Sequence, residues 1–235
     1  MIGITLLYWK LFQKKTLSEM GITKQFGNYF IGVATGVLLA GISVLAVILT
    51  GTIKYHGVFK SIDFTVILLM LGGFIVQGAM EEILCRGVVL FSLKDKTPLP
   101  VAIGVSTLVF MIPHLSKLSE DKPLFVLLAI LNLVLISVIF SLLIVRFHNI
   151  WAACGLHSVW NFILFSILGL NLSGNDGTTA AVFDVRSVGE NVLNGGEYGI
   201  EASIITSAVL AVSAVLIFVL NKRKQKDNSV SFSDL

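Results

Sequence analysis

The sequence has few charges for its length. Only 13% of its 235 residues are Asp, Glu, Lys or Arg, whereas 55% are hydrophobic, and the charges stand in clusters between long uncharged stretches. A soluble domain would intersperse its charges, so this pattern argues against one. The net charge is only +3, and the cations are divided among several short segments. No nucleic-acid partner is therefore expected.

Cysteine is equally scarce. Cys85 and Cys154 are the only two, and they lack the CxxC spacing of redox and metal motifs, so no disulfide framework is predicted. We expect both to pack as small apolar residues. Cys154 precedes His157 by three residues on the same helical face, which leaves a metal contact as the alternative.

Long uncharged runs are abundant and indicate membrane-spanning helices, each of which needs about 20 residues. Three runs reach that length: 29 residues between Lys24 and Lys54, 23 between Lys122 and Arg146, and 20 between Glu201 and Lys222. Three further runs are shorter or interrupted by a histidine: Phe64 to Met80, Thr97 to Pro113, and Asn149 to Asp176. The alternating pattern of a membrane β-barrel is absent. The predicted fold is all-α, a polytopic transmembrane helical bundle with six full spans plus a short N-terminal helix.

One membrane domain with a short segment on each side is expected. Residues 1–27 are predicted to form a short N-terminal helix and a cytoplasmic loop, and no small-residue cleavage site follows the helix, so no signal peptide is expected. Residues 28–220 form the predicted transmembrane domain. Residues 221–235 form a basic cytoplasmic tail, which is polar and expected to be disordered.

The cations predict the orientation in the membrane. With loops alternating between the two sides, eleven cations fall on the side of the C-terminus and five on the other, which makes the C-terminus cytoplasmic. The acidic loop of residues 171–201 then lies outside, either as a plain connection or as a lid that faces a substrate. We expect an integral protein of a bacterial cell membrane.

Glu81, Glu82 and Arg86 follow 17 uncharged residues on one predicted helix. Ionisable groups inside a membrane cost about 2.5–3.5 kcal/mol each on insertion scales and usually mark function. Arg86 lies four residues after Glu82, a spacing that predicts an ion pair and leaves Glu81, about 100° around the helix, to face another element. The alternative is a solvated helix end, but residues 87–91 stay apolar, which favours a longer helix.

Two later motifs supply imidazole and carboxamide groups. His114 closes an uncharged run one helical turn after Phe110, and it could also be a simple helix-end residue. His157 and Asn161 have the i, i+4 spacing that places both on one helical face, where they could instead hydrogen-bond a neighbouring helix. If the three segments converge, a carboxylate and neutral imidazoles could activate a water, with His114 and His157 as possible ligands of Zn²⁺. Asn161 could donate to the oxyanion of a hydrolysed carbonyl.

The ordered motifs Glu-Glu-x-x-x-Arg, Phe-x-x-x-His and His-x-x-x-Asn resemble those of the CPBP intramembrane proteases. This family includes the type II CAAX prenyl endopeptidases and the Abi, or bacteriocin-immunity, proteins. The resemblance implies a CPBP-like protease domain, with its motifs within residues 81–161, that cleaves a membrane-associated protein or peptide. It implies catalytic roles for six residues, with Glu81 as the water activator: Glu81, Glu82, Arg86, His114, His157 and Asn161. It implies a metalloprotease only if zinc is bound.

Two other functions fit the same residues. A non-catalytic immunity or regulatory partner would use the polar groups to hold its helices together. A small transporter could use them as a proton relay, although the sequence lacks the paired interrupted helices typical of such folds.

Overall fold

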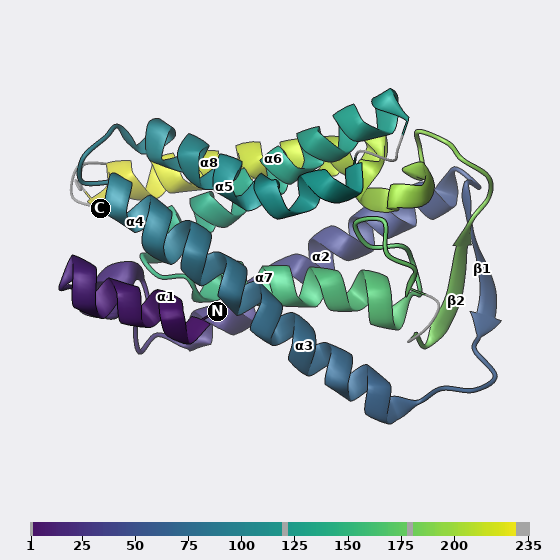
Figure 1. The fold of residues 1–235 in the computed structure, drawn as a ribbon. Coiled ribbons are helices and arrows are strands. Elements are labelled where there is room, and N and C mark those ends of the chain that lie inside the picture. Colours follow the sequence, from purple (N-terminus) through teal and green to yellow (C-terminus); the bar gives the residue numbers. More distant parts are fainter. Residues whose placement is uncertain (1, 119–121, 178–180, 229–235) are drawn as a thin grey trace.

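The computed structural model describes residues 2–118, 122–177 and 181–228, and most of these residues are helical (Figure 1). The α-helices are α1 (Ile2–Tyr8), α2 (Gly27–Leu49), α3 (Phe64–Glu82), α4 (Phe91–Leu93), α5 (Leu99–Leu118), α6 (Pro123–Phe147), α7 (Trp151–Phe162) and α8 (Ile204–Asn228). Among the described residues, π-helical segments are η1 (Trp9–Gln13), η3 (Ile83–Leu90) and η4 (Ile163–Ile167), and complete 3₁₀ turns are η2 (Ser18–Met20), η6 (Gly196–Tyr198) and η7 (Ile200–Ala202).

The helices have the composition of membrane spans. Within the described residues, four are long and apolar enough to cross a membrane: Gly27–Leu49, Phe64–Leu93, Pro123–Phe147 and Ile204–Lys224. The predicted spans at α5 and α7 are the shorter apolar helices Leu99–Leu115 and Trp151–Ile167. The protein is therefore an integral membrane protein with at least the four long helices as candidate spans, and the full set of six stays a prediction.

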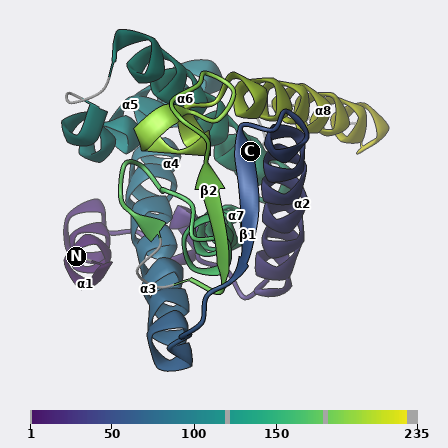
Figure 2. The same cartoon turned by 90° about the vertical axis from the view of Figure 1, so that its right-hand side faces the viewer.

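Helix α7 lies in the middle of the bundle, surrounded by α2, α3 and α6 (Figure 2). Glycines let α2 approach it closely. A Cβ on Gly32 would lie 2.0 Å from the carbonyl oxygen of Ala152, and one on Gly155 would lie 2.1 Å from that of Tyr29. This contact buries α7 almost completely and fixes its polar residues in the interior.

A two-stranded sheet was not part of the all-α prediction. Strand β1 (Ile53–Val58) pairs antiparallel with β2 (Phe183–Ser187), and Ile53 lies opposite Ser187. The ribbon lies at the end of the bundle opposite α4 (Figure 1). The pairing joins segments about 130 residues apart in the sequence, a separation at which local pattern gives no signal.

Two other expectations concern the segments that follow the spans. The helix that carries Arg86 continues through η3 and α4, as predicted. The expectation of disorder is wrong for residues 221–228, which continue α8. Lys, Arg and Gln are good helix formers, and cations are favourable near a helix C-terminus. The rest of the predicted tail, residues 229–235, lies outside the described residues.

Candidate active site

A cavity of about 520 Å³ lies among α3, α5, α6 and α7. Four of the six predicted catalytic residues line it: Glu81, His114, His157 and Asn161. The other two, Glu82 and Arg86, are fully buried behind its wall. The structure therefore brings the three motifs together around one cavity, although they come from three helices. Their catalytic roles stay a prediction.

Glu82 connects the first motif to the third. Its Oε1 accepts a hydrogen bond from Nη1 of Arg86 at 3.0 Å, which is the predicted ion pair, and lies 3.1 Å from Nδ1 of His157. An ionised carboxylate can only accept, so Nδ1 of His157 carries a proton. In neutral imidazole this leaves Nε2 with its lone pair available on the other side of the ring.

The guanidinium of Arg86 packs against two neighbouring aromatic rings. Its Cζ is 4.8 Å from the ring centre of Phe110 and 5.0 Å from that of Phe140, an arrangement that stabilises a cation in an apolar interior. Nη2 donates to the hydroxyl and the carbonyl oxygen of Ser137. The buried cation is thus paired, stacked and hydrogen-bonded, as a charge at zero exposure requires.

Glu81 faces the cavity from α3. Its Oε1 accepts a hydrogen bond from Nε2 of Gln77 at 3.1 Å. Its Oε2 is buried, has no hydrogen-bond partner among the described residues, and lies 3.8 Å from Nε2 of His157. That separation is too long for a direct hydrogen bond but leaves room for a water bound to both atoms.

The other two motif residues line the cavity from α5 and α7. Nδ1 of His114 lies 3.1 Å from the carbonyl oxygen of Phe110, so this nitrogen donates to it. Phe110 thus orients His114 through its backbone and covers Arg86 with its ring, which gives both ends of the Phe-x-x-x-His motif a physical role. Asn161 lies one turn after His157 and is 7% exposed.

Several residues of the site were missed in the sequence. The ring of Phe140 stacks on His157 at 5.1 Å, and Ser137 holds Arg86, both from α6. Gln77 holds Glu81. The sequence contains one signal that could have identified Gln77 and Ser137 as site residues, since each is a polar residue inside an uncharged apolar run. Phe140 had none, because aromatic residues are ordinary in such a helix.

Glu201 of η7 also lines the cavity and ties the acidic loop to the bundle. Its Oε1 accepts from Nε1 of Trp160 at 3.0 Å, and its Oε2 accepts from the backbone and the hydroxyl of Ser173, both at 2.8 Å. Leu172, Ser173 and Asn175 contribute further wall. Of the two readings of residues 171–201, these contacts favour a segment that faces the cavity.

The described side chains do not fit a protein-held zinc. Within residues 2–118, 122–177 and 181–228, no three His, Cys, Asp or Glu side chains come together as metal ligands, whereas zinc in catalytic sites takes three. Cys154 is buried and free, as is Cys85, and this agrees with the packing role expected for both. Zinc held by His114 and His157 stays a prediction, and none of the proposed steps depends on it.

The chain was compared with known proteins. Residues 63–163 match the family model described as type II CAAX prenyl endopeptidase Rce1-like. No curated protein and no solved structure matches the chain. The matched segment is shorter than half of the 235 residues, but it contains all three motifs and the whole of α7. The match over residues 63–163 supports the resemblance of the three motifs to the CPBP family.

Proposed function

We propose that the protein is an intramembrane endopeptidase that hydrolyses a peptide bond of a membrane-associated protein or peptide. The observation that carries the proposal is the 3.8 Å separation between Oε2 of Glu81 and Nε2 of His157 on the wall of the cavity. A water between them can donate one hydrogen to each atom. The carboxylate is then placed as a general base and the imidazole orients the nucleophile.

Glu81 takes the proton of the water as its oxygen attacks the carbonyl carbon of the substrate. The resulting oxyanion accepts a hydrogen bond from the carboxamide of Asn161. This donor stabilises the negative charge, as in an oxyanion hole. Glu81 then passes the proton to the amide nitrogen as the C–N bond breaks. The products are a carboxylic acid and an amine, and the Glu81 carboxylate is regenerated.

The remaining motif residues position these groups. Glu82 fixes the ring of His157 through Nδ1, and Arg86 compensates the charge of Glu82. His114 is proposed to bind the substrate from the α5 side, where Nε2 can accept a peptide N–H. With the C-terminus in the cytoplasm, the cavity wall formed by Ser173, Asn175 and Glu201 faces the external end of the bundle.

The proposal is tested by Glu81→Gln, which keeps an acceptor for Gln77 but removes the base. New protein termini are mapped in membranes of cells that carry the wild type, Glu81→Gln, or Glu190→Gln in the exposed loop as a control, with the amount of each protein measured. We expect membrane-protein termini that occur with the wild type and with Glu190→Gln but not with Glu81→Gln. If Glu81→Gln accumulates normally and gives the same termini, the protein is not a peptidase of this kind, and a non-catalytic membrane partner becomes the better reading.

A further inference from the structure

The wall of the proposed catalytic cavity carries negative charge without a cation of the protein. Glu81 and Glu201 line it, and among the described residues no lysine or arginine does. The two imidazoles of the wall are neutral in the proposed mechanism. Glu82, behind the wall, differs from these two acids, because Nη1 of Arg86 lies 3.0 Å from its carboxylate. A cleft lined by charges of one sign attracts ligands of the opposite sign.

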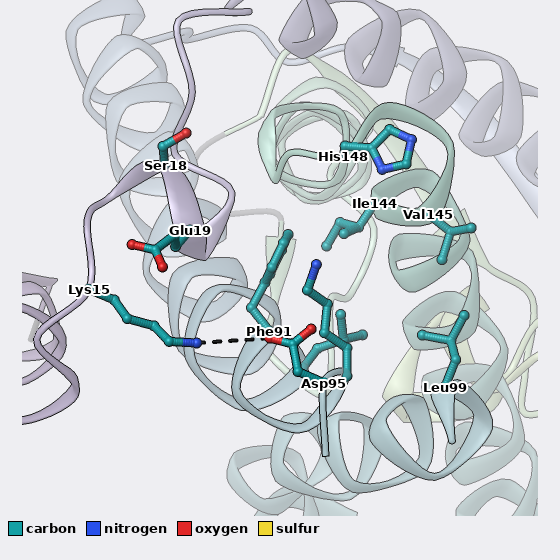
Figure 3. A pocket seen from close by; sticks show the side chains of 11 residues that line it. Lys15, Ser18, Glu19, Phe91, Asp95, Leu99, Ile144, Val145 and His148 are labelled. Atoms are coloured by element: carbon teal, nitrogen blue, oxygen red, sulfur yellow. Dashed lines mark ion pairs between the residues drawn. The ribbon is translucent and has the colours of Figure 1, made fainter. Parts of the chain in front are cut away.

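A cavity at the α4 end of the bundle has a different arrangement of charges. It measures about 610 Å³, and its wall holds two lysines and two carboxylates, Lys15, Lys94, Glu19 and Asp95. Figure 3 shows the ion pair of Lys15 with Asp95 in this wall. These charges balance within the protein, so they select no charged ligand. The uncompensated carboxylates are therefore a property of the catalytic cavity and not of both cavities.

Glu201 has no counter-ion in the described part of the chain, although it is half-buried. Its three hydrogen bonds come from an indole N–H and from two groups of Ser173, which hold the carboxylate in place but do not neutralise it. Two other acids of the same loop are accommodated differently, since Glu190 pairs with Lys122 and Glu197 is exposed to solvent. A carboxylate that is removed from water and lacks a cation of its own protein is best compensated by a cation of a ligand.

Asn161 is a second sign that a ligand lies beside Glu201. It is only 7% exposed, it lines the cavity, and it makes no hydrogen bond within the described residues, so its polar atoms have no partner other than a ligand or water. Trp160 precedes it on α7 and donates from Nε1 to Oε1 of Glu201, so one indole ring connects the carboxylate to the segment that carries Asn161. A compact cavity of about 520 Å³ is roughly 10 Å across, which an extended peptide crosses in about three residues.

We propose that Glu201 determines specificity by binding a positively charged group of the substrate, a lysine or arginine side chain or a free amino terminus, close to the cleaved bond. This inference rests on the proposed peptidase function. A carboxylate has about four acceptor positions, and Trp160 and Ser173 occupy three of them, so one remains for the cation. An uncharged segment leaves the cavity with its full negative charge, and an acidic segment adds to it. The cation lies within about three residues of the cleaved bond, because an extended chain spans the cavity in that length.

The test uses the full chain purified in detergent and a peptide library prepared from a digested proteome, with the cut bonds identified by mass spectrometry. Bonds cut by Glu81→Gln give the background. We expect cations to be enriched near the bonds that the wild type cuts, and Glu201→Gln to lower this enrichment about tenfold, the effect of losing a hydrogen bond to a charged group. Glu201→Asp keeps the charge and should keep much of the enrichment. Libraries with acetylated lysines or with blocked amino termini show which cation is bound, and the wild type should lose the corresponding cuts.

Two variants of the same loop are the controls. Glu197→Gln removes an exposed charge outside the cavity, and Asn171→Ala removes a hydrogen bond within the loop to the backbone of Glu197, also outside the cavity. Both should keep the wild-type preference, and melting temperatures show that each variant folds. If the wild type cuts no bond beyond the Glu81→Gln background, the proposed function fails and this inference fails with it. Cutting without a preference for cations, or a preference that Glu201→Gln retains, would overturn the role of Glu201 alone.

Discussion

Nδ1 of His157 and Nη1 of Arg86 donate to the same oxygen, Oε1 of Glu82, at 3.1 and 3.0 Å. This one carboxylate oxygen therefore links the orientation of the His157 ring on α7 to the buried Arg86, which follows Glu82 on the same helix. Glu82 touches no part of the cavity wall, so it acts on the reaction through His157.

Glu82→Gln should reduce both stability and activity. It leaves the fully buried Arg86 without its counter-ion, and breaking one side of a buried pair typically costs about 3–5 kcal/mol. Thermal unfolding followed by tryptophan fluorescence measures the loss. Glu82→Gln combined with Arg86→Met removes the unpaired charge and should recover much of the melting temperature, while peptide cleavage stays low because His157 is no longer fixed. Recovery of cleavage in the double variant would contradict this role of Glu82.

Phe140→Leu should slow cleavage more than its effect on stability explains. The substitution removes the ring that stacks on His157 and covers Arg86, whereas the leucine keeps much of the buried apolar volume. Phe125→Leu is the control, since Phe125 is also buried on α6 but does not line the cavity. We expect similar losses of stability, about 1–2 kcal/mol, in both variants. Only Phe140→Leu should lower the rate of appearance of new termini, and equal rates would show that the ring serves packing alone.

Glu201→Gln should loosen the loop of residues 171–201. Its carboxylate accepts three hydrogen bonds, from Trp160 and from two groups of Ser173, and an amide nitrogen cannot accept in place of an oxygen. Limited proteolysis of the purified protein should cut the loop faster in this variant than in the wild type. Glu197→Gln is the control, since Glu197 is an exposed acid of the same loop. Equal cutting in both variants would mean that the ribbon alone holds the loop.

Gly32→Ala should separate α2 from α7. The new methyl carbon would lie 2.0 Å from a backbone oxygen of Ala152, a position that only helix movement can relieve, and overpacking of this kind costs about 1–3 kcal/mol. Gly41→Ala on the same helix meets nothing within 4 Å and should stabilise slightly through helix propensity. The melting temperatures of the two variants therefore should move in opposite directions. A Gly32→Ala protein as stable as Gly41→Ala would contradict the close contact.

Much of the fold was predictable because long uncharged runs of residues indicate membrane helices. The continuation of the helix beyond Arg86 and the pairing of Arg86 with Glu82 followed from local spacing. The contacts of Phe140 and Ser137 could not follow from it, because they join residues more than 50 positions away from Arg86. The π-helical segments η3 and η4 begin just after Glu82 and Asn161, where local geometry is set by packing and not by propensity.

The stacked position of Arg86 has a consequence for how the site responds to its surroundings. An arginine keeps its proton at every pH at which proteins fold, and the rings of Phe110 and Phe140 carry no ionisable group. This part of the scaffold therefore gives the same electric field in acid and in alkaline medium. A change of cleavage rate with pH therefore does not originate in this cation or in the two rings that cover it.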